Sequence, residues 1–280
     1  MTALPKILLT LALGLFGFGC SAVVDADRAQ CETTSDCRAR GEAFENSVCK
    51  KNFCEVEVVD EWSCTEHGML TSDSKKPISV DFSLFDAVSM NTVSGVEARL
   101  CRKLDLECAK PVAMMTTGSD GVVQFDVAPL FDGYVEVRRE SYDTAMMFLP
   151  VINEPTSLGQ FPYTEAAIAK LLGVQLGIEI NPAAGRVLAL VAGCDKQTTA
   201  GVSLVGENMG TEAHSFYAVN GFPSTTATET DSSGFAGYVN VAAGSITVNA
   251  ELEDGRRIAR TGLFIRPGWI TMRRFQPWTD

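Results

Sequence analysis

The sequence predicts a mainly β protein: two tandem β-sandwiches with one short connecting helix, preceded by a small disulfide-rich module. Short runs of alternating apolar and polar residues, bounded by Gly, Asp and Ser, predict the strands. An internal repeat predicts two sandwiches, and cysteines clustered behind an apolar N-terminal run predict the module. We place the module and its linker at 20–66, the sandwiches at 78–152 and 186–276, and the linker with the helix at 153–185.

The first residues have the pattern of a secretory signal. Lys6 precedes the apolar run ILLTLALGLFGFG, which ends at Cys20-Ser21-Ala22. A basic start, a short apolar run and a small-residue exit are typical of a signal peptide. The run is shorter than the roughly 20 apolar residues that a membrane-spanning helix needs. We therefore predict a signal peptide at 1–19 and export of the chain.

Two cleavage sites fit this segment. Gly19-Cys20 followed by Ser21 resembles a bacterial lipobox, although Gly17 stands where lipoboxes carry an aliphatic residue. The resemblance implies cleavage before Cys20 and acylation of that cysteine with palmitate. It also implies a lipid anchor in the bacterial cell envelope, with the outer membrane as the expected location. Cleavage after Ala22 would instead give a periplasmic or secreted protein.

Composition and charge indicate a folded protein and disfavour some classes of binding partner. Hydrophobic residues make up 46% of the 280 residues, enough for folded domains. A formal net charge of −12 disfavours binding to nucleic acid and to anionic membrane surfaces. Acylation of Cys20 would leave eight of the nine cysteines, an even number, and no C-x-x-C pair is present. We therefore expect disulfides, with no metal and no cofactor.

Residues 25–66 form an acidic, cysteine-rich segment with eleven acids, five bases and few large apolar side chains. Such a segment needs cross-links to hold it together. Its C-x5-C-x11-C-x4-C spacing resembles the four-cysteine modules of extracellular proteins, such as Dickkopf-type N-terminal segments. Four cysteines allow three pairings, and the resemblance implies Cys31–Cys49 and Cys37–Cys54.

The other four cysteines are farther apart. Cys101 and Cys108 have six residues between them, around a polar loop, and predict a local bridge. That leaves Cys64 and Cys194, which would join the linker after the module to the second sandwich. A Cα separation above about 7 Å would rule out either bridge.

The rest of the chain contains an internal repeat. ISVDFSLF, SGVEARL, SDGVVQFDV and GYVEV correspond to RVLALVAG, AGVSLV, SSGFAGYVNV and GSITV. Three glycine pairs align: Gly95 with Gly201, Gly121 with Gly234, and Gly133 with Gly244. Phe125 lies four positions after Gly121, and Tyr238 lies four positions after Gly234. The shared spacing predicts two copies of one β-sandwich.

These blocks are similar to those of carboxypeptidase-regulatory-like, or transthyretin-like, domains. The pieces that carry the resemblance are GVEARL, TTGSDGVVQF and GYVEV, then GVSLVG, TETDSSGFAGY and GSITV. The resemblance implies Ig-like, seven-stranded sandwiches in which the Asp/Ser-Gly turn joins two strands and the aromatic residue enters the core. It implies an accessory or display role and no catalytic residue. The connecting helix is expected to begin at Thr164 and end at Gly173, with Ile168, Leu171 and Leu172 on one face.

Residues that suggest catalysis or metal binding have simpler explanations. No G-x-S-x-G elbow is present, and neither His67 nor His214 lies beside a serine or cysteine motif. Asp120 and Asp231 suggest calcium ligands, but they lack the D-x-[DN]-x-[DN]-G loop and a turn is favoured. Glu253-Asp254 is expected to be solvated.

Tryptophans and arginines offer two further candidate surfaces. Trp62, Trp269 and Trp278 are far apart, so core packing or a domain joint is favoured over a carbohydrate platform. Six arginines near the C-terminus are expected on the solvent face of the last strands, the alternative being contact with an acidic patch elsewhere in the chain: Arg256, Arg257, Arg260, Arg266, Arg273 and Arg274.

These patterns predict a non-catalytic, envelope-anchored lipoprotein that acts in surface display, adhesion or ligand binding. Its partners would be the membrane, through the anchor, and a protein or glycan ligand. The alternatives are an exported hydrolase or protease inhibitor, or a carbohydrate-binding module.

Overall fold

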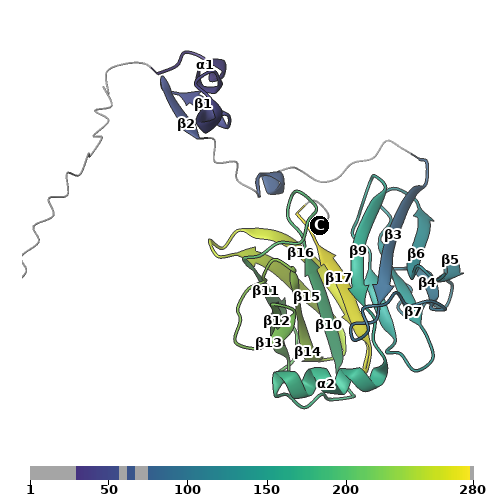
Figure 1. Ribbon diagram of the computed structural model, residues 1–280. Helices are drawn as coiled ribbons and strands as arrows, with labels where there is room; N and C mark the ends of the chain where they lie inside the picture. The colour runs from purple at the N-terminus through teal and green to yellow at the C-terminus, as the bar shows by residue number, and fades with distance from the viewer. Residues whose placement is uncertain (1–29, 57–61, 67–74, 278–280) are drawn as a thin grey trace, which may run out of the picture. The chain divides into compact units, whose positions relative to one another are not determined.

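A computed structural model describes residues 30–56, 62–66 and 75–277, which belong to two units, 1–59 and 60–280 (Figure 1). The first unit holds α1 (Thr34–Arg38), the 3-10 turn η1 (Glu42–Phe44), β1 (Ser47–Lys50) and β2 (Phe53–Val56). β1 and β2 form an antiparallel hairpin. The turn residues Lys51 and Asn52 both have positive φ, as a two-residue hairpin turn of this hand requires. Cys20 and the predicted signal peptide lie outside the described residues.

The second unit is mainly β, and the tandem β-sandwich predicted from the sequence is confirmed. The first sandwich contains β3 (Ile78–Phe85), β4 (Glu97–Arg102), β5 (Ala113–Thr116), β6 (Val122–Val127), β7 (Gly133–Arg138), β8 (Ala145–Phe148) and β9 (Thr156–Pro162). The second contains β10 (Gly185–Val191), β11 (Val202–Glu207), β12 (His214–Val219), β13 (Phe222–Ser224), β14 (Phe235–Val241), β15 (Gly244–Leu252), β16 (Arg257–Ile265) and β17 (Ile270–Phe275). Helix α2 (Ala166–Leu176) connects them, and the 3-10 turn η2 (Ser63–Glu66) precedes them.

One nine-stranded sheet runs through both sandwiches, in the order β13-β12-β14-β10-β17-β8-β7-β4-β5. Two three-stranded sheets, β11-β15-β16 and β6-β3-β9, complete the sandwiches. The connection between the copies is the parallel pairing of β17 with β8, from Ile270 opposite Ala145 to Arg273 opposite Phe148. The two sandwiches therefore share backbone hydrogen bonds and form one continuous β structure.

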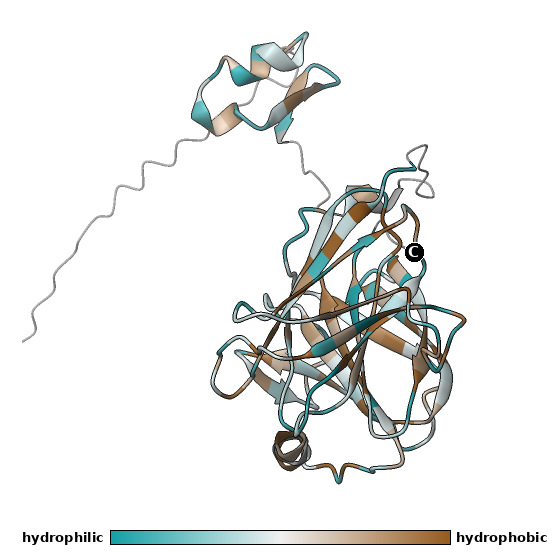
Figure 2. Cartoon of the chain, turned by 90° about the vertical axis from the view of Figure 1, so that its right-hand side faces the viewer, coloured by the Kyte–Doolittle hydropathy of each residue, from teal (hydrophilic) through white to brown (hydrophobic). Residues whose placement is uncertain are grey.

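The small sheets cover opposite faces of the nine-stranded sheet. Met146 of β8 belongs to the core with Ile246 and Leu263, whereas the next residue, Met147, belongs to the core with Phe82. Successive side chains of a strand point to opposite faces, and β8 and β17 are buried at every position. Hydrophobic residues lie along the strands of this unit in Figure 2. The central strands are consequently buried on both sides.

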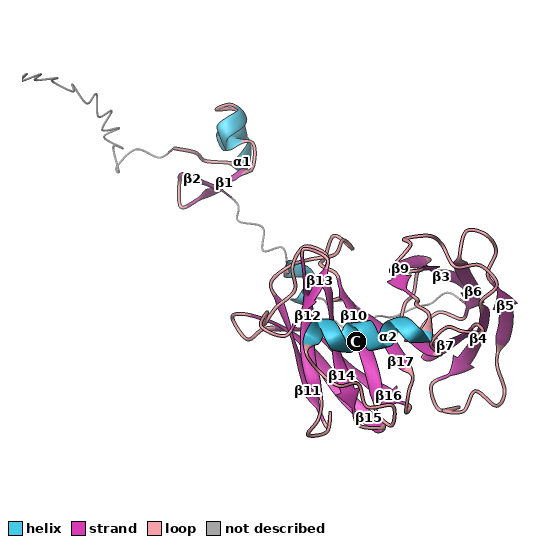
Figure 3. Cartoon of the chain, turned by 60° about the horizontal axis from the view of Figure 1, so that its bottom comes forward, coloured by secondary structure: helices cyan, strands magenta, loops and turns pink. Residues whose placement is uncertain are grey.

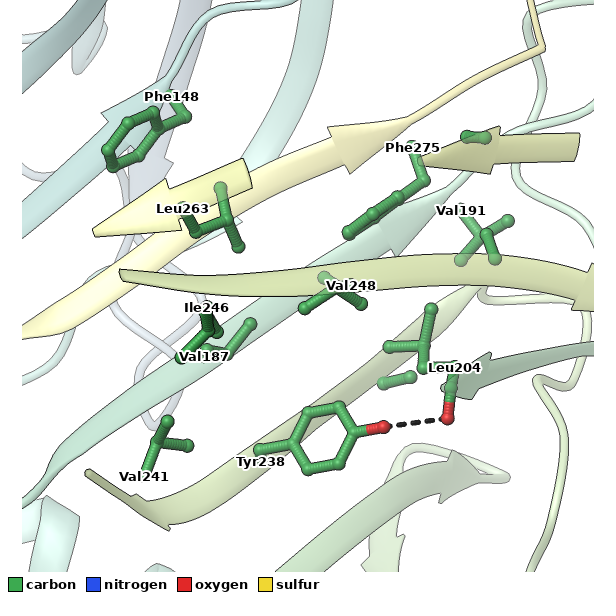
Figure 4. Close-up of a cluster of buried hydrophobic side chains, with 14 of the residues drawn as sticks. Phe148, Val187, Val191, Leu204, Tyr238, Val241, Ile246, Val248, Leu263 and Phe275 are labelled. Carbon is green, nitrogen blue, oxygen red and sulfur yellow. Dashed lines mark hydrogen bonds between the residues drawn. The ribbon is translucent and has the colours of Figure 1, made fainter. Parts of the chain in front are cut away.

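The core of the second sandwich contains side chains from both copies (Figure 4). Phe148 of the first copy lies in the same cluster as Leu263 and Phe275. At the other end of this cluster, the Tyr238 hydroxyl donates a hydrogen bond to the carbonyl of Leu204 at 2.6 Å. Apolar packing therefore crosses the boundary between the copies in addition to the strand pairing.

The repeat extends further than its sequence blocks. β9 pairs in parallel with β3, and β17 pairs in parallel with β10. β9 thus occupies in the first copy the place that β17 occupies in the second, although it lies in the segment 153–185 that we expected to be a linker. The sequences TSLGQFP and ITMRRF share no pattern that would have revealed this relation.

Helix α2 packs its Leu172 and Leu176 against Phe216 of β12, on the outer side of the large sheet (Figure 3). Its predicted ends were wrong: the N-cap is Glu165, and the C-cap is Gly177 in a left-handed conformation, φ +67°. Leu171, expected on the packed face, is 53% exposed. No helix among the described residues has the length and apolar character needed to cross a membrane.

Candidate functional site

Two buried threonines explain why the same turn sequence occurs in both copies. The Thr117 hydroxyl accepts a hydrogen bond from the Val96 amide at 3.0 Å and donates one to the carbonyl of Val93 at 3.0 Å. The Thr230 hydroxyl accepts from the Val202 amide at 3.2 Å and likewise donates to a backbone carbonyl, at 2.9 Å. Thr117 thus ties the start of β4 to the turn before β6, and Thr230 ties the start of β11 to the turn before β14, so both residues have a structural role.

The glycines and aspartates of these turns also have structural partners. Gly121 has φ +67° and Gly234 has φ +65°, and a Cβ at either would lie within 2.6 Å of a backbone carbonyl oxygen. Asp120 accepts the Val122 amide at 3.1 Å. Asp231 accepts the Ser233 amide at 2.9 Å. Burial raises the pKa of Asp231, but its hydrogen bonds outweigh burial and lower it below the ordinary value. These contacts agree with the interpretation of both aspartates as turn residues.

The structure joins the four predicted cysteine pairs, with Cα–Cα separations between 5.4 and 5.8 Å: Cys31–Cys49, Cys37–Cys54, Cys64–Cys194 and Cys101–Cys108. Cys64 and Cys194 are 130 residues apart, so their bridge ties η2 to the loop after β10. The sulfurs of Cys31, Cys37 and Cys54 lie within 4.8 Å of one another, a spacing that suits a metal ion. All three are in disulfides and provide no thiolate for coordination.

Three of the six arginines expected on the solvent face are instead buried: Arg266, Arg273 and Arg274. The favoured prediction was therefore wrong for them, because β16 and β17 lie against the first sandwich. Arg266 Nη1 donates to Oε2 of the fully buried Glu136 of β7 at 2.9 Å. Contact with an acidic group elsewhere in the chain, the alternative considered above, is what Arg266 makes.

Trp269 lies within a charged cluster at this joint. The guanidinium of Arg266 is 4.2 Å from the centre of its ring, and that of Arg138 is 5.2 Å away. Arg138 also forms an ion pair with Glu136, so one carboxylate holds both guanidiniums. This arrangement makes Trp269 a joint residue, as predicted, whereas Trp62 is buried in the core of the second sandwich.

Other polar contacts join the copies at the same boundary. Arg186 Nη1 of β10 donates to the Asp143 carboxylate, just before β8, at 2.9 Å, and both side chains are 9% exposed. Arg273 Nη1 donates to the carbonyl of Phe148 at 3.4 Å. The joint between the sandwiches therefore combines strand pairing, apolar packing and buried ion pairs.

An open pocket of about 440 Å³ lies beside β9, where the two copies meet. It is lined by residues of β9 (Ser157, Gly159 and Gln160), of the large sheet (Leu190, Phe235 and Arg274), of the loop after β10 (Lys196, Gln197 and Thr198), and by Phe85 and Ser233. Two cations and no carboxylate are among these residues. The pocket offers hydroxyls, amides, two aromatic rings and positive charge.

Arg274 is the most unusual residue of the pocket. Its side chain is buried, and it donates to the carbonyls of Leu158 at 2.7 Å and Lys196 at 2.5 Å, and to Gln276 Oε1 at 3.1 Å. Burial lowers the pKa of Arg274. Gly159 has φ +88°, and a Cβ there would lie 3.0 Å from Arg274 Nη1. The glycine thus allows the backbone of β9 to approach the guanidinium.

No sequence pattern identified Glu136, Asp143 or Arg186 as residues of the joint. Glu136 alternates with apolar neighbours in GYVEVR, a pattern that ordinarily marks a solvent-facing residue. Of the two histidines, His214 is exposed in β12, and His67 lies outside the described residues, as does Trp278. Among the exposed acids, Asp254 forms an ion pair with Arg256 at 2.7 Å.

No family model matches the chain, and no curated protein matches its sequence. Among solved structures it is similar to the Bacillus anthracis TIE protein, with 10% identity over 71% of this chain and 33% of that chain, at a TM-score of 0.26. It is similar to the streptococcal ancillary pilin, with 11% identity over 74% of this chain and 64% of that chain, at a TM-score of 0.26. It is also similar to BcpA, the major pilin subunit of Bacillus cereus, with 10% identity over 72% of this chain and all of that chain, at a TM-score of 0.26. The chain thus spans 33% of the first structure and 64% of the second.

Proposed function

We propose that this chain is an exported, lipid-anchored and non-catalytic protein that displays a rigid double sandwich at the bacterial cell envelope. The observation that carries the proposal is the apolar run ending at Gly19-Cys20 in front of a disulfide-bonded chain. Disulfides form and persist in oxidising compartments outside the cytosol. Acylated Cys20 would be the anchor, and the outer membrane is the proposed location.

The joint between the sandwiches supports a display role. Neither copy can rotate against the other without breaking the β8–β17 hydrogen bonds and the Arg266–Glu136 ion pair. A rigid body of this kind holds a surface at a fixed geometry, which suits adhesion or ligand binding. On this proposal the N-terminal unit is an extracellular disulfide module of the Dickkopf type, held by Cys31–Cys49 and Cys37–Cys54.

Metabolic labelling with radioactive palmitate tests the anchor. Wild type and Ala22→Leu, which blocks the alternative cleavage after Ala22, are expected to carry label and to sediment with membranes. Cys20→Ala is expected to carry none. Equal labelling of Cys20→Ala, or a wild-type protein that is unlabelled and begins at Val23, would overturn the proposal in favour of a periplasmic or secreted protein. Separation of inner and outer membranes then tests the proposed location.

A further inference from the structure

We propose that the pocket beside β9 is a binding site for a carboxylated sugar, held through its carboxylate by Arg274 and Lys196. This inference extends the display and ligand-binding role proposed above, but it does not depend on acylation of Cys20. It rests on the charge of the buried Arg274 in the pocket lining, on the chemistry of the other lining residues and on the close approach of the β9 backbone to the guanidinium.

The charge of Arg274 points to an anionic ligand. Burying a guanidinium is costly unless a carboxylate or another anion compensates it. Among the described residues no carboxylate forms an ion pair with Arg274, and its three acceptors are two carbonyls and an amide oxygen. A guanidinium has five N–H donors, so two remain for a ligand. The planar fork of arginine matches the two oxygens of a carboxylate.

A second cation lies at the rim of the same pocket. Lys196 is exposed, and its Nζ is 2.8 Å from Oε1 of Glu154, whose side chain is 62% exposed. This exposed pair is weak, so Glu154 does not prevent Lys196 from contacting a ligand carboxylate. The lining residues themselves include two cations and no acid, and the carboxylates of Glu154 and Asp81 bond to Lys196 and Ser157 at the edge of the pocket.

The walls match the rest of a sugar. Gln160 and Gln197 supply amide groups for ring hydroxyls. The hydroxyls of Ser157 and Thr198 donate to Asp81 and to the carbonyl of Ser232, so they serve as acceptors for a ligand. Phe85 and Phe235, both partly buried, supply apolar ring surfaces for the C–H face of a pyranose. The volume of about 440 Å³ accommodates one or two sugar rings.

Calorimetric titration of the purified full-length protein in mild detergent tests the inference, whatever its acylation state. Glucuronate is the probe, glucose is the same ring without the carboxylate, and acetate is the carboxylate without the ring. Glucuronate is expected to bind at least about tenfold more tightly than either, because a hydrogen bond to a charged group contributes a factor of about ten or more. Raising the salt concentration is expected to weaken this binding.

Variants distinguish binding in the pocket from attraction to cations elsewhere on the surface. Lys196→Gln is expected to weaken glucuronate binding several-fold, and Arg274→Gln to abolish it. Lys103→Gln removes an exposed cation outside the pocket and is expected to change nothing. If Arg274→Gln fails to fold, Gln160→Ala, at an exposed wall residue, replaces it and is expected to weaken binding.

Several results would overturn the inference: no glucuronate binding by wild type, equal affinity for glucose, equal affinity for acetate, or unchanged affinity in Lys196→Gln together with Gln160→Ala. None of these results changes the outcome of palmitate labelling, so failure of the pocket is distinguishable from failure of the anchor.

Discussion

Replacing Glu136 with Gln tests whether the buried ion pairs stabilise the joint. The Glu136 side chain is fully buried, and its Oε2 accepts from Arg266 Nη1 at 2.9 Å. Gln has nearly the same volume, so the substitution removes the charge without opening a cavity. It leaves the Arg266 side chain, 10% exposed, without a carboxylate. Removing one partner of a buried pair costs about 3–5 kcal/mol, a large share of the roughly 5–15 kcal/mol that stabilises a typical domain.

Equilibrium urea unfolding, followed by tryptophan fluorescence and far-UV circular dichroism, measures this cost as a change in the free energy of unfolding. Glu97→Gln is the matched control, because Glu97 pairs with Arg99 at 2.6 Å while the side chains remain 43% and 31% exposed. Such exposed pairs contribute about 0–1 kcal/mol. If Glu136→Gln costs no more than Glu97→Gln, the buried pair does not stabilise the joint and the reasoning is refuted.

Three further predictions follow from the turns and the disulfides. Thr117→Val and Thr230→Val each leave a buried amide without its acceptor, and each should cost about 1–3 kcal/mol in urea unfolding; a cost near zero would contradict the hydrogen-bond argument. Replacing both Cys64 and Cys194 with Ser opens a loop of 130 residues and should cost about 5 kcal/mol on the chain-entropy model; an unchanged melting temperature would contradict it. The lowered pKa of Asp231 means that its contribution to stability is complete above its ordinary pKa of 3.8 and is lost as pH falls through the folded-state value. Asp231→Asn should therefore flatten the fall in stability below about pH 4, and an unaltered pH profile would count against this role.

The strands and the two copies could be predicted because each depends on local patterns. ISVDFSLF alternates with period two, and β3 over Ile78–Phe85 alternates between buried and partly buried residues. The glycine anchors recur because Gly121 and Gly234 both need positive φ. Such signals depend on a few neighbouring residues, so they can be read without knowledge of the partner strands.

The continuous sheet could not be predicted from the sequence, because alternation identifies which face of a strand is buried but not which strand lies beside it. Ala145 and Ile270 pair across more than a hundred residues, and neither carries a signal for the other. Because the sequence does not show which strands are neighbours, the burial of the arginines of β17 could not be predicted either. Arg273 and Arg274 are consecutive, so their side chains point to opposite faces of β17, and both faces are covered by sheets that the sequence does not locate.

The pocket was missed for a related reason. Its lining comes from β3, β9, β10, β14 and β17, from the loop after β10 and from the turn before β14, so it forms only when both copies are assembled. Gly159 in TSLGQFP was the one local sign, a glycine inside a strand, which often marks a close approach of another group. In the structure that group is the guanidinium of Arg274.

Residue-resolved hydrogen exchange during mild urea denaturation tests the continuity of the two sandwiches most directly. If they form one cooperative unit, the amides of β8 and β17 exchange only when the whole second unit unfolds, together with those of β3 and β10. Exchange of the β10 and β17 amides at a urea concentration where β3 and β6 stay protected would contradict the account, because the sandwiches would then unfold separately.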